Sequence, residues 1–164
     1  VTVRKLYRSM HGKLIRTVLS ADGVNTNPLS YMTIMDGGIR LNAKLELPDT
    51  GHESYPLVIV VHGFTGHMEE THITAVARLF NELGCATLRA DMYGHGRSGG
   101  SFSGHTLDKW LSNLMTLIDY GASLEHVSDL YLCGHSQGGL TVMLAAAMER
   151  ARVTGKIVDM KNFR

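Results

Sequence analysis

The chain has 164 residues and a mass of 18.0 kDa, with 44% hydrophobic and 19% charged residues, a composition typical of one folded globular domain. It excludes a disordered chain, a collagen-like fibre and a small disulfide-bonded scaffold. A net charge of +1 and a pI near 8.0 give no overall attraction for nucleic acid or an anionic membrane. No apolar run reaches the roughly 18 residues of a membrane helix, and no secretory signal is recognisable, so we expect a cytoplasmic protein.

The distribution of charge and cysteine limits partners and cofactors further. Residues 1–31 carry five basic residues against one acidic residue and no persistent apolar face. We interpret them as a basic leader of doubtful structure ahead of a folded part over 32–164, because a misplaced start or a natural extension explains them better than a nucleic-acid-binding arm. Cys85 and Cys133 lie far apart without C-x-x-C spacing, so we expect reduced thiols and no metal or redox site.

After the leader, short apolar runs alternate with longer helical patterns, which predicts an α/β fold with a mostly parallel central sheet flanked by helices. Alternating apolar residues over 39–47 indicate a half-exposed strand near a sheet edge. Five consecutive apolar residues over 57–61 are typical of a central strand covered on both faces. The further expected elements are a helix over 70–83, a strand over 86–90, a helix over 107–124, a buried strand over 130–133, a short apolar helix over 140–148 and a short strand over 156–160.

The segment Gly134-His135-Ser136-Gln137-Gly138 matches the pattern G-x-S-x-G between an expected strand and an expected helix. In a nucleophile elbow the chain turns so sharply that the flanking positions must be nearly free of side chains, which explains Gly134 and Gly138. The turn lifts the serine oxygen above the sheet, at the N-terminus of a helix whose amides favour developing negative charge. The pattern therefore predicts that Ser136 is a nucleophile.

A second glycine-containing segment, His62-Gly63-Phe64-Thr65-Gly66, follows the most buried expected strand. Acyl transfer needs two hydrogen-bond donors aimed at the tetrahedral oxyanion, and the elbow supplies one of them through the amide of Gln137. We expect the amide of Phe64 to be the other, because Gly63 and Gly66 let the backbone approach the substrate closely. The alternative is an ordinary loop in which Phe64 faces the core.

These segments resemble the α/β-hydrolase superfamily, and more closely the bacterial cinnamoyl (feruloyl) esterases. The resemblance covers about Met32 to Arg150 and is carried by His62-Gly63-Phe64-Thr65-Gly66-His67, the loop 91–98, His105-Thr106-Leu107-Asp108-Lys109-Trp110-Leu111 and residues 134–150. It implies a serine carboxylic-ester hydrolase that forms an acyl-enzyme on Ser136. Its substrates would be small-molecule esters of hydroxycinnamic acids with plant cell-wall sugars or quinate, and no cofactor is needed.

The chain departs from this resemblance after the nucleophile. The triad order of α/β-hydrolases is serine, acid, histidine, yet no histidine follows Ser136 in the 164 residues. We therefore identify no triad acid or base, and we expect a truncated, partial fold that lacks the late strands and the lid and is poorly active. His67 is the best substitute base by position, but we do not favour it. His67 and His72 are five residues apart, unlike the i, i+4 spacing of a helical zinc pair.

Two alternatives stay open at this point. The same fold and nucleophile can serve another substrate class, in a monoacylglycerol lipase, a thioesterase or a peptidase. A non-catalytic fragment that binds a partner through an open sheet edge is the alternative outside enzymology. The sequence leaves open the acyl and alcohol preference, the oligomeric state, and whether the truncation and the leader are biological or artefacts.

Overall fold

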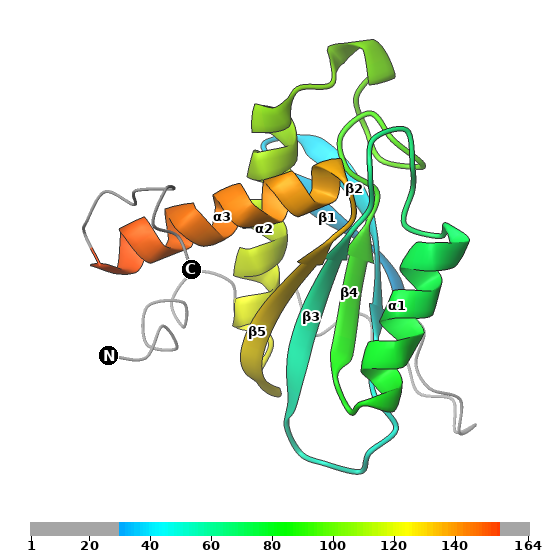
Figure 1. Ribbon diagram of the computed structural model, residues 1–164, viewed down its shortest axis with the longest axis vertical. Coiled ribbons are helices and arrows are strands. Elements are labelled where there is room, and N and C mark those ends of the chain that lie inside the picture. The colour runs from blue at the N-terminus through cyan, green and yellow to red at the C-terminus, as the bar shows by residue number, and fades with distance from the viewer. Residues whose placement is uncertain (1–29, 155–164) are drawn as a thin grey trace.

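The computed structural model of the chain describes residues 30–154, which form one mixed β-sheet with helices on both faces (Figure 1). Residues 1–29 of the basic leader and the expected strand over 156–160 lie outside the described residues. In chain order the elements are β1 (Ser30–Asp36), β2 (Ile39–Glu46), β3 (Tyr55–Val61), α1 (Thr71–Glu82), β4 (Ala86–Ala90), the 3₁₀ turn η3 (Phe102–Gly104), α2 (Leu107–Ser123), β5 (Val127–Gly134) and α3 (Gln137–Thr154).

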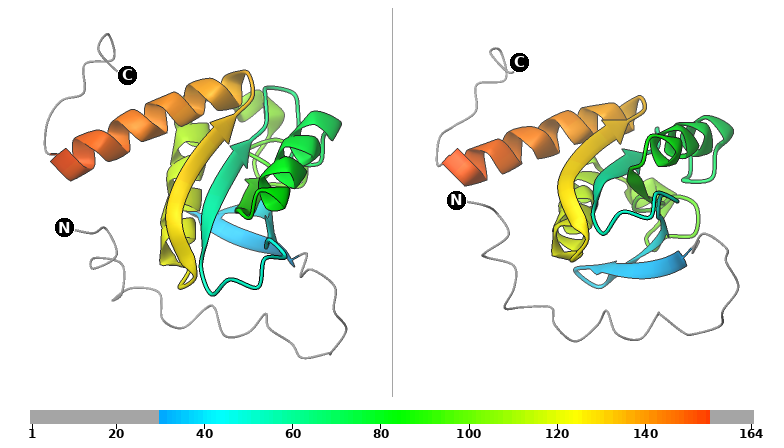
Figure 2. Two further views of the ribbon diagram at one scale, coloured as in Figure 1. Left: turned by 60° about the horizontal axis from the view of Figure 1, so that its bottom comes forward. Right: turned by 90° about the horizontal axis from the view of Figure 1, so that it is seen from below.

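The strands lie across the sheet in the order β1-β2-β4-β3-β5. β3 is parallel to both of its neighbours, β4 and β5, whereas β2 is antiparallel to β1 and to β4. Helix α1 packs on one face of the sheet, and α2 and α3 pack on the other (Figures 1 and 2). The expected α/β fold with flanking helices is confirmed, although the parallel pairing is limited to β4, β3 and β5.

The side chains of β3 face two separate cores. Leu57, Ile59 and Val61 point into a core shared with α2, and Val58 and Val60 point into a smaller core under α1. All five are at most 2% exposed, which confirms the prediction of a central strand covered on both faces. The predicted helix over 70–83, strand over 86–90 and helix over 107–124 are also confirmed, as α1, β4 and α2.

Two strands and one helix differ from the sequence-based expectation. β1 is not predicted, although Gly37 and Gly38 (φ +52° and +90°) form the two-residue turn that joins it to β2, and paired glycines are a hairpin signal. The strand expected over 130–133 is confirmed as part of β5, but the expectation that it is buried is wrong. β5 pairs with β3 alone among the described strands, and Tyr131 stays 56% exposed. α3 is longer than the expected helix over 140–148 at both ends, because it begins directly after the turn at Ser136 and continues to Thr154.

A buried carboxylate at the end of β4 joins three segments. Asp91 is 3% exposed, and its oxygens accept hydrogen bonds from the Met68 amide (2.8 Å), the Asn42 side chain (2.9 Å) and the Arg97 amide (2.8 Å). Hydrogen bonds to an ionised acceptor are about twice as strong as neutral ones. They fix the loop after β3, strand β2 and the loop after β4 in one arrangement.

His62, at the end of β3, makes a second buried link. Its Nε2 accepts a hydrogen bond from the Met92 amide at 3.0 Å, so Nδ1 carries the proton and donates to the Gly63 carbonyl at 2.7 Å. Burial lowers the pKa of His62, and although the Gly63 hydrogen bond opposes that shift, the nearby His95 adds to it. The ring is fully buried and stays neutral in the fold.

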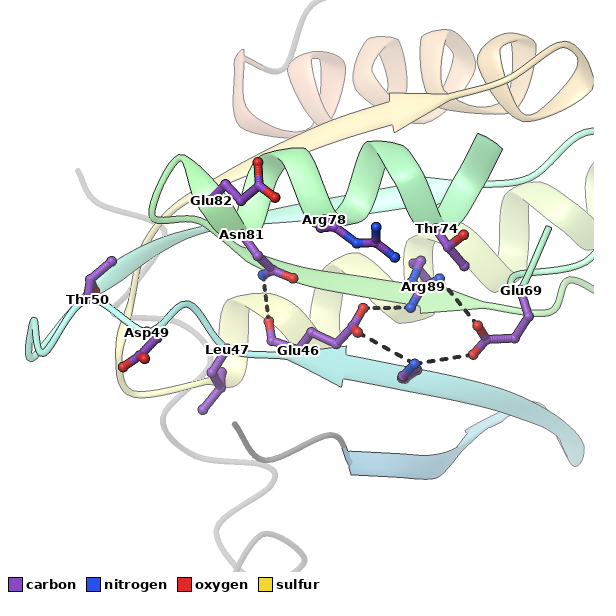
Figure 3. A pocket seen from close by; sticks show the side chains of 11 residues that line it. Glu46, Leu47, Asp49, Thr50, Glu69, Thr74, Arg78, Asn81, Glu82 and Arg89 are labelled. Atoms are coloured by element: carbon purple, nitrogen blue, oxygen red, sulfur yellow. Dashed lines mark hydrogen bonds and ion pairs between the residues drawn. The ribbon is translucent and has the colours of Figure 1, made fainter. Parts of the chain in front are cut away.

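Four charged side chains fix the far end of the same loop (Figure 3). Arg89 is 1% exposed; it donates to Glu46 at 2.6 Å and to the Met68 carbonyl at 3.0 Å, and it lies 3.6 Å from Glu69. Lys44 lies 3.5 Å from each of the two carboxylates. Two positive and two negative groups balance here, beside a hollow of about 630 Å³ between β2 and α1. The loop after β3 is therefore held at both ends.

We expect the free energy of unfolding to fall as the pH drops below about 6.5, the ordinary pKa of an unfolded histidine. The pKa of His62 is lower in the fold, so between the two values the unfolded chain binds a proton that the folded ring does not. The stabilising contribution of the neutral ring is therefore complete above the unfolded pKa and is lost as the pH falls toward the folded one. Thermal unfolding followed by circular dichroism across this range measures the effect.

The variant His62→Leu tests the assignment. It leaves the buried Met92 amide without its partner, which costs about 1–3 kcal/mol at neutral pH, and leaves the Gly63 carbonyl with the Gly66 amide alone. It also removes the proton linkage, so its stability should depend less on pH below about 6.5 than that of the unchanged chain. His52→Leu, at an exposed position, is the matched control. A pH dependence that persists unchanged in His62→Leu would contradict the role given to this ring.

Candidate active site

The predicted nucleophile stands on the turn between β5 and α3. Ser136 is exposed and has a φ of +53°. Within residues 30–154 the non-glycine residues with positive φ are Ser136 and Thr65 (φ +64°), one in each of the two segments predicted to carry the chemistry. Such a conformation costs about 1–3 kcal/mol for a residue with a side chain, and it clusters at functional sites.

The glycines beside the serine are required because backbones approach closely here. A Cβ on Gly134 would overlap the Gly138 carbonyl, and a Cβ on Gly138 would overlap the carbonyls of Val61 and His62. The His135 amide donates a hydrogen bond to the Val61 carbonyl at 3.0 Å. The turn is thus seated on the carboxyl end of β3, as the G-x-S-x-G pattern predicts.

The loop after β3 lies directly against this turn. A Cβ on Gly63 would be 3.3 Å from the Cβ of Ser136. The Gly63 carbonyl accepts hydrogen bonds from the His62 ring at 2.7 Å and from the Gly66 amide at 3.1 Å. Because that carbonyl shares a planar peptide group with the amide of Phe64, the two hydrogen bonds also fix the direction of the Phe64 N–H.

Both predicted oxyanion donors are unpaired. In the described part of the chain, neither the Phe64 N–H nor the Gln137 N–H donates to a protein acceptor, and the Oγ of Ser136 has no hydrogen-bond partner. Unpaired amides at a helix N-terminus and in the adjoining loop can receive developing negative charge. The predicted site residues lie on two adjoining segments: Gly63 and Phe64 on one, and Gly134, Ser136, Gln137 and Gly138 on the other.

No histidine among residues 30–154 is hydrogen-bonded to the serine. His135 faces His72, with ring centroids 4.5 Å apart. His67 accepts a hydrogen bond from the Glu69 amide, at 3.2 Å within its own turn. His105 contacts the side chain of Gln137 instead. The general base and its orienting acid therefore stay unassigned.

Rings surround the Phe64 side of the site. Phe64, Phe102, His95, His105 and Trp110 contact one another with centroids 5.0 to 5.9 Å apart. Burial lowers the pKa of His105, and His95 and Lys109 add to the shift, so its neutral ring can accept the Gln137 side-chain amide. Sequence analysis does not single out His95 or Phe102, because their contact with Phe64 joins loops that follow different strands.

The described part of the chain shows neither a metal-binding cluster nor a membrane-spanning helix. Residues 30–154 hold no group of three or more histidine, cysteine, aspartate or glutamate side chains placed to bind a metal ion. None of the helices described there is long and apolar enough to cross a bilayer. Cys85 and Cys133 are free thiols. The hollow in Figure 3 is lined by none of the predicted site residues, so it is separate from the turn at Ser136.

Known proteins share this arrangement. The sequence profile of the family described as serine aminopeptidase, S33, matches residues 52–159. The structure of Est1E from Butyrivibrio proteoclasticus with ferulic acid bound is 60% identical, with a TM-score of 0.71, over 73% of this chain and 48% of that one. A monoacylglycerol lipase of Mycolicibacterium smegmatis is 31% identical over 104 residues, which are 63% of this chain and 36% of the lipase.

A mitochondrial palmitoyl-protein thioesterase of Homo sapiens is 30% identical over 102 residues, which are 62% of this chain and 32% of the thioesterase. The chain thus spans about half the length of Est1E and about a third of the two curated relatives. The resemblance read from the sequence is confirmed, and the described residues form part of the α/β-hydrolase fold. Since the profile covers more than half of its length, the chain belongs to the serine aminopeptidase S33 family of α/β-hydrolases.

Proposed function

We propose that the chain carries the nucleophile of a serine carboxylic-ester hydrolase that acts on hydroxycinnamoyl (feruloyl-type) esters. The observation that carries the proposal is the exposed Ser136 on its strained turn, with the unpaired amides of Phe64 and Gln137 on the adjoining backbone. The 60% identity to a structure with ferulic acid bound supports the substrate class. The activity of the whole protein is part of this proposal, since the chain covers 48% of that relative.

The proposed reaction has two acyl-transfer steps. Ser136 Oγ attacks the ester carbonyl carbon and loses its proton to a general base, while the amides of Phe64 and Gln137 donate to the oxyanion. Collapse of the tetrahedral intermediate releases the alcohol, which takes up the proton, and leaves the acyl group on Ser136. Water then attacks the acyl-enzyme by the same route and releases the acid. The triad order places the base after the serine, where these 164 residues contain no histidine, so we assign none.

Hydrolysis of monoacylglycerols is the second candidate, favoured by the 31% identity to the mycobacterial lipase. The rings around Phe64 favour the hydroxycinnamoyl ester, because aromatic groups gain from stacked and edge-to-face contacts in addition to burial. Serine acyl transfer uses side chains and backbone dipoles, so the proposal includes no cofactor. The proposed partner is a small-molecule ester, and the proposed setting is the cytoplasm.

A fluorophosphonate probe should label the chain at Ser136 alone. Labelling by the 164-residue chain should be slow, because a serine hydrolase without its histidine loses about 10⁶-fold in kcat, while the oxyanion hole and binding leave about 10³ to 10⁴ over water. Free imidazole should accelerate it by supplying a base. Mass spectrometry of the labelled peptide measures the rate, and Ser136→Ala is the blank. Equal labelling of the blank, or fast labelling that imidazole does not change, would contradict the assignment.

Gly63→Ala should slow that labelling by about 100-fold, the typical effect of losing one oxyanion donor. The added Cβ would be 2.9 Å from Nδ1 of the exposed His135 ring, which can turn aside. It would also be 3.3 Å from the Cβ of Ser136, a contact relieved when the loop that carries the Phe64 amide and the nucleophile separate by a few tenths of an ångström. Gly99→Ala is the matched control, since its Cβ would meet nothing closer than 3.4 Å. An unchanged labelling rate in Gly63→Ala, with circular dichroism also unchanged, would remove Phe64 from the proposed oxyanion hole.

The two substrate candidates are separated by rates measured in the presence of imidazole. We expect methyl ferulate to be hydrolysed about 10-fold faster than a monoacylglycerol at equal concentration, which is the lower end of discrimination by a shaped pocket. Chromatography of the released acids measures both rates. Hydrolysis of a short p-nitrophenyl ester is the control, because it measures the reactivity of Ser136 without depending on the shape of the acyl group. Faster hydrolysis of the monoacylglycerol would replace the first candidate by the second.

A further inference from the structure

Two half-exposed rings and one buried ring pack together at the proposed oxyanion loop. Phe64 and Phe102 are stacked, with centroids 5.3 Å apart and ring planes at 28°, and about half of each side chain is exposed (48% and 51%). His95 is 5% exposed and packs against both, with centroids 5.9 Å from Phe64 and 5.1 Å from Phe102. These three residues are called the ring cluster below. An apolar surface of this kind next to a reacting group is a place where a ligand ring can pack.

One polar atom of the ring cluster lacks a partner. His95 Nδ1 lies 2.8 Å from the Tyr93 carbonyl, so Nδ1 carries the proton and Nε2 is a bare acceptor. Nε2 is buried and has no hydrogen-bond partner among the described residues. A buried acceptor without a donor is unfavourable and calls for an explanation. A hydroxyl group brought by a ligand would satisfy it.

We propose that the ring cluster is a binding subsite for a ring of the ester substrate that has an apolar face and carries a hydroxyl group. The face of the ring packs on Phe64 and Phe102, and the hydroxyl donates to His95 Nε2. The inference rests on the proposed function, because the amide of Phe64 is the proposed oxyanion donor and its side chain therefore adjoins the reacting ester. Both the hydroxycinnamoyl ring and a sugar ring of the alcohol have this chemistry.

The proposed subsite opens by the movement of one exposed side chain, Phe102. Phe102 lies in the three-residue turn η3 and is half exposed, and exposed side chains change rotamer within nanoseconds. In the proposed subsite, Phe102 turns away from His95, so that the ligand hydroxyl reaches Nε2 while the ligand ring packs against Phe64 and the turned Phe102 ring. The subsite can therefore open without a change in the sheet or in the turn at Ser136.

Trp110 provides a probe that does not depend on catalysis. It is the single tryptophan of the chain, its ring centroid lies 5.0 Å from that of His95, and its Nε1–H donates to the Tyr93 carbonyl. Its indole N–H therefore gives one resonance in a ¹⁵N spectrum. Ferulic acid and a methyl arabinofuranoside are titrated separately into the 164-residue chain with Ser136→Ala. A saturable shift with at least one ligand is expected, and the ligand that produces it identifies the source of the ring.

Phe102→Leu tests the stacking surface. The variant keeps an apolar side chain but removes the aromatic face, so the dissociation constant of the bound ligand should rise about fivefold. Tyr131→Leu is the matched control, because it removes an exposed aromatic ring on β5, which is not part of the ring cluster. No shift of the Trp110 resonance with either ligand, or equal affinity in Phe102→Leu and the control, would overturn the subsite.

Two substitutions of His95 test the hydroxyl contact. His95→Phe keeps the ring, and His95→Asn keeps a donor for the Tyr93 carbonyl, so the two variants share the loss of the Nε2 acceptor. The unchanged chain should bind the ligand about fivefold more tightly than the analogue in which the hydroxyl is methylated. Both variants should lose that preference. If both variants still prefer the free hydroxyl to the methylated analogue, the contact with His95 is overturned. If the ligand shifts the Trp110 resonance but Ser136 never reacts with the fluorophosphonate, the result counts against the proposed function alone.

Discussion

The buried carboxylate of Asp91 holds together the segments on which the proposed chemistry depends. It accepts hydrogen bonds from β2, from the loop after β3 and from the loop after β4. A carboxylate removed from water needs several donors, and these three backbone and side-chain groups supply them. Without this group, the loop that carries the Phe64 amide would keep its links through His62 and Arg89 and the contacts of Glu69 with Lys44 and Tyr31.

The loop after β3 has no regular secondary structure, yet its contacts fix the direction of the Phe64 N–H. A loop has few of the hydrogen bonds that keep helices and strands rigid, and an oxyanion donor is useful only if its direction is fixed. In this chain the direction is set by neutral groups at one end, the His62 ring and the Gly66 amide. At the other end Arg89 donates to the Met68 carbonyl and forms an ion pair with Glu69. The positive φ of Thr65 is sustained between these two anchors.

The central strand and the turn at Ser136 could be predicted from the sequence because their signals are local. Five apolar residues in a row define β3, and two glycines that flank a serine define the turn. Asp91 and Asn42 are 49 residues apart, so no window along the chain connects them, and the role of Asp91 becomes visible only in the sheet. The apolar run of β5 indicates a strand, but whether that strand is buried depends on which elements lie beside it, and Tyr131 stays exposed at the end of the sheet order.

The strained backbone of Ser136 sets thermal stability against chemistry in this chain. Glycine at this position would relieve about 1–2 kcal/mol of left-handed strain, partly offset by the roughly 0.5–1 kcal/mol that glycine adds to the entropy of the unfolded state. Selection for thermal stability alone would therefore favour the substitution Ser136→Gly, which stabilises the fold and removes the nucleophile. Directed evolution of this protein toward higher thermal stability therefore needs a screen that measures the reactivity of Ser136 as well as the melting temperature.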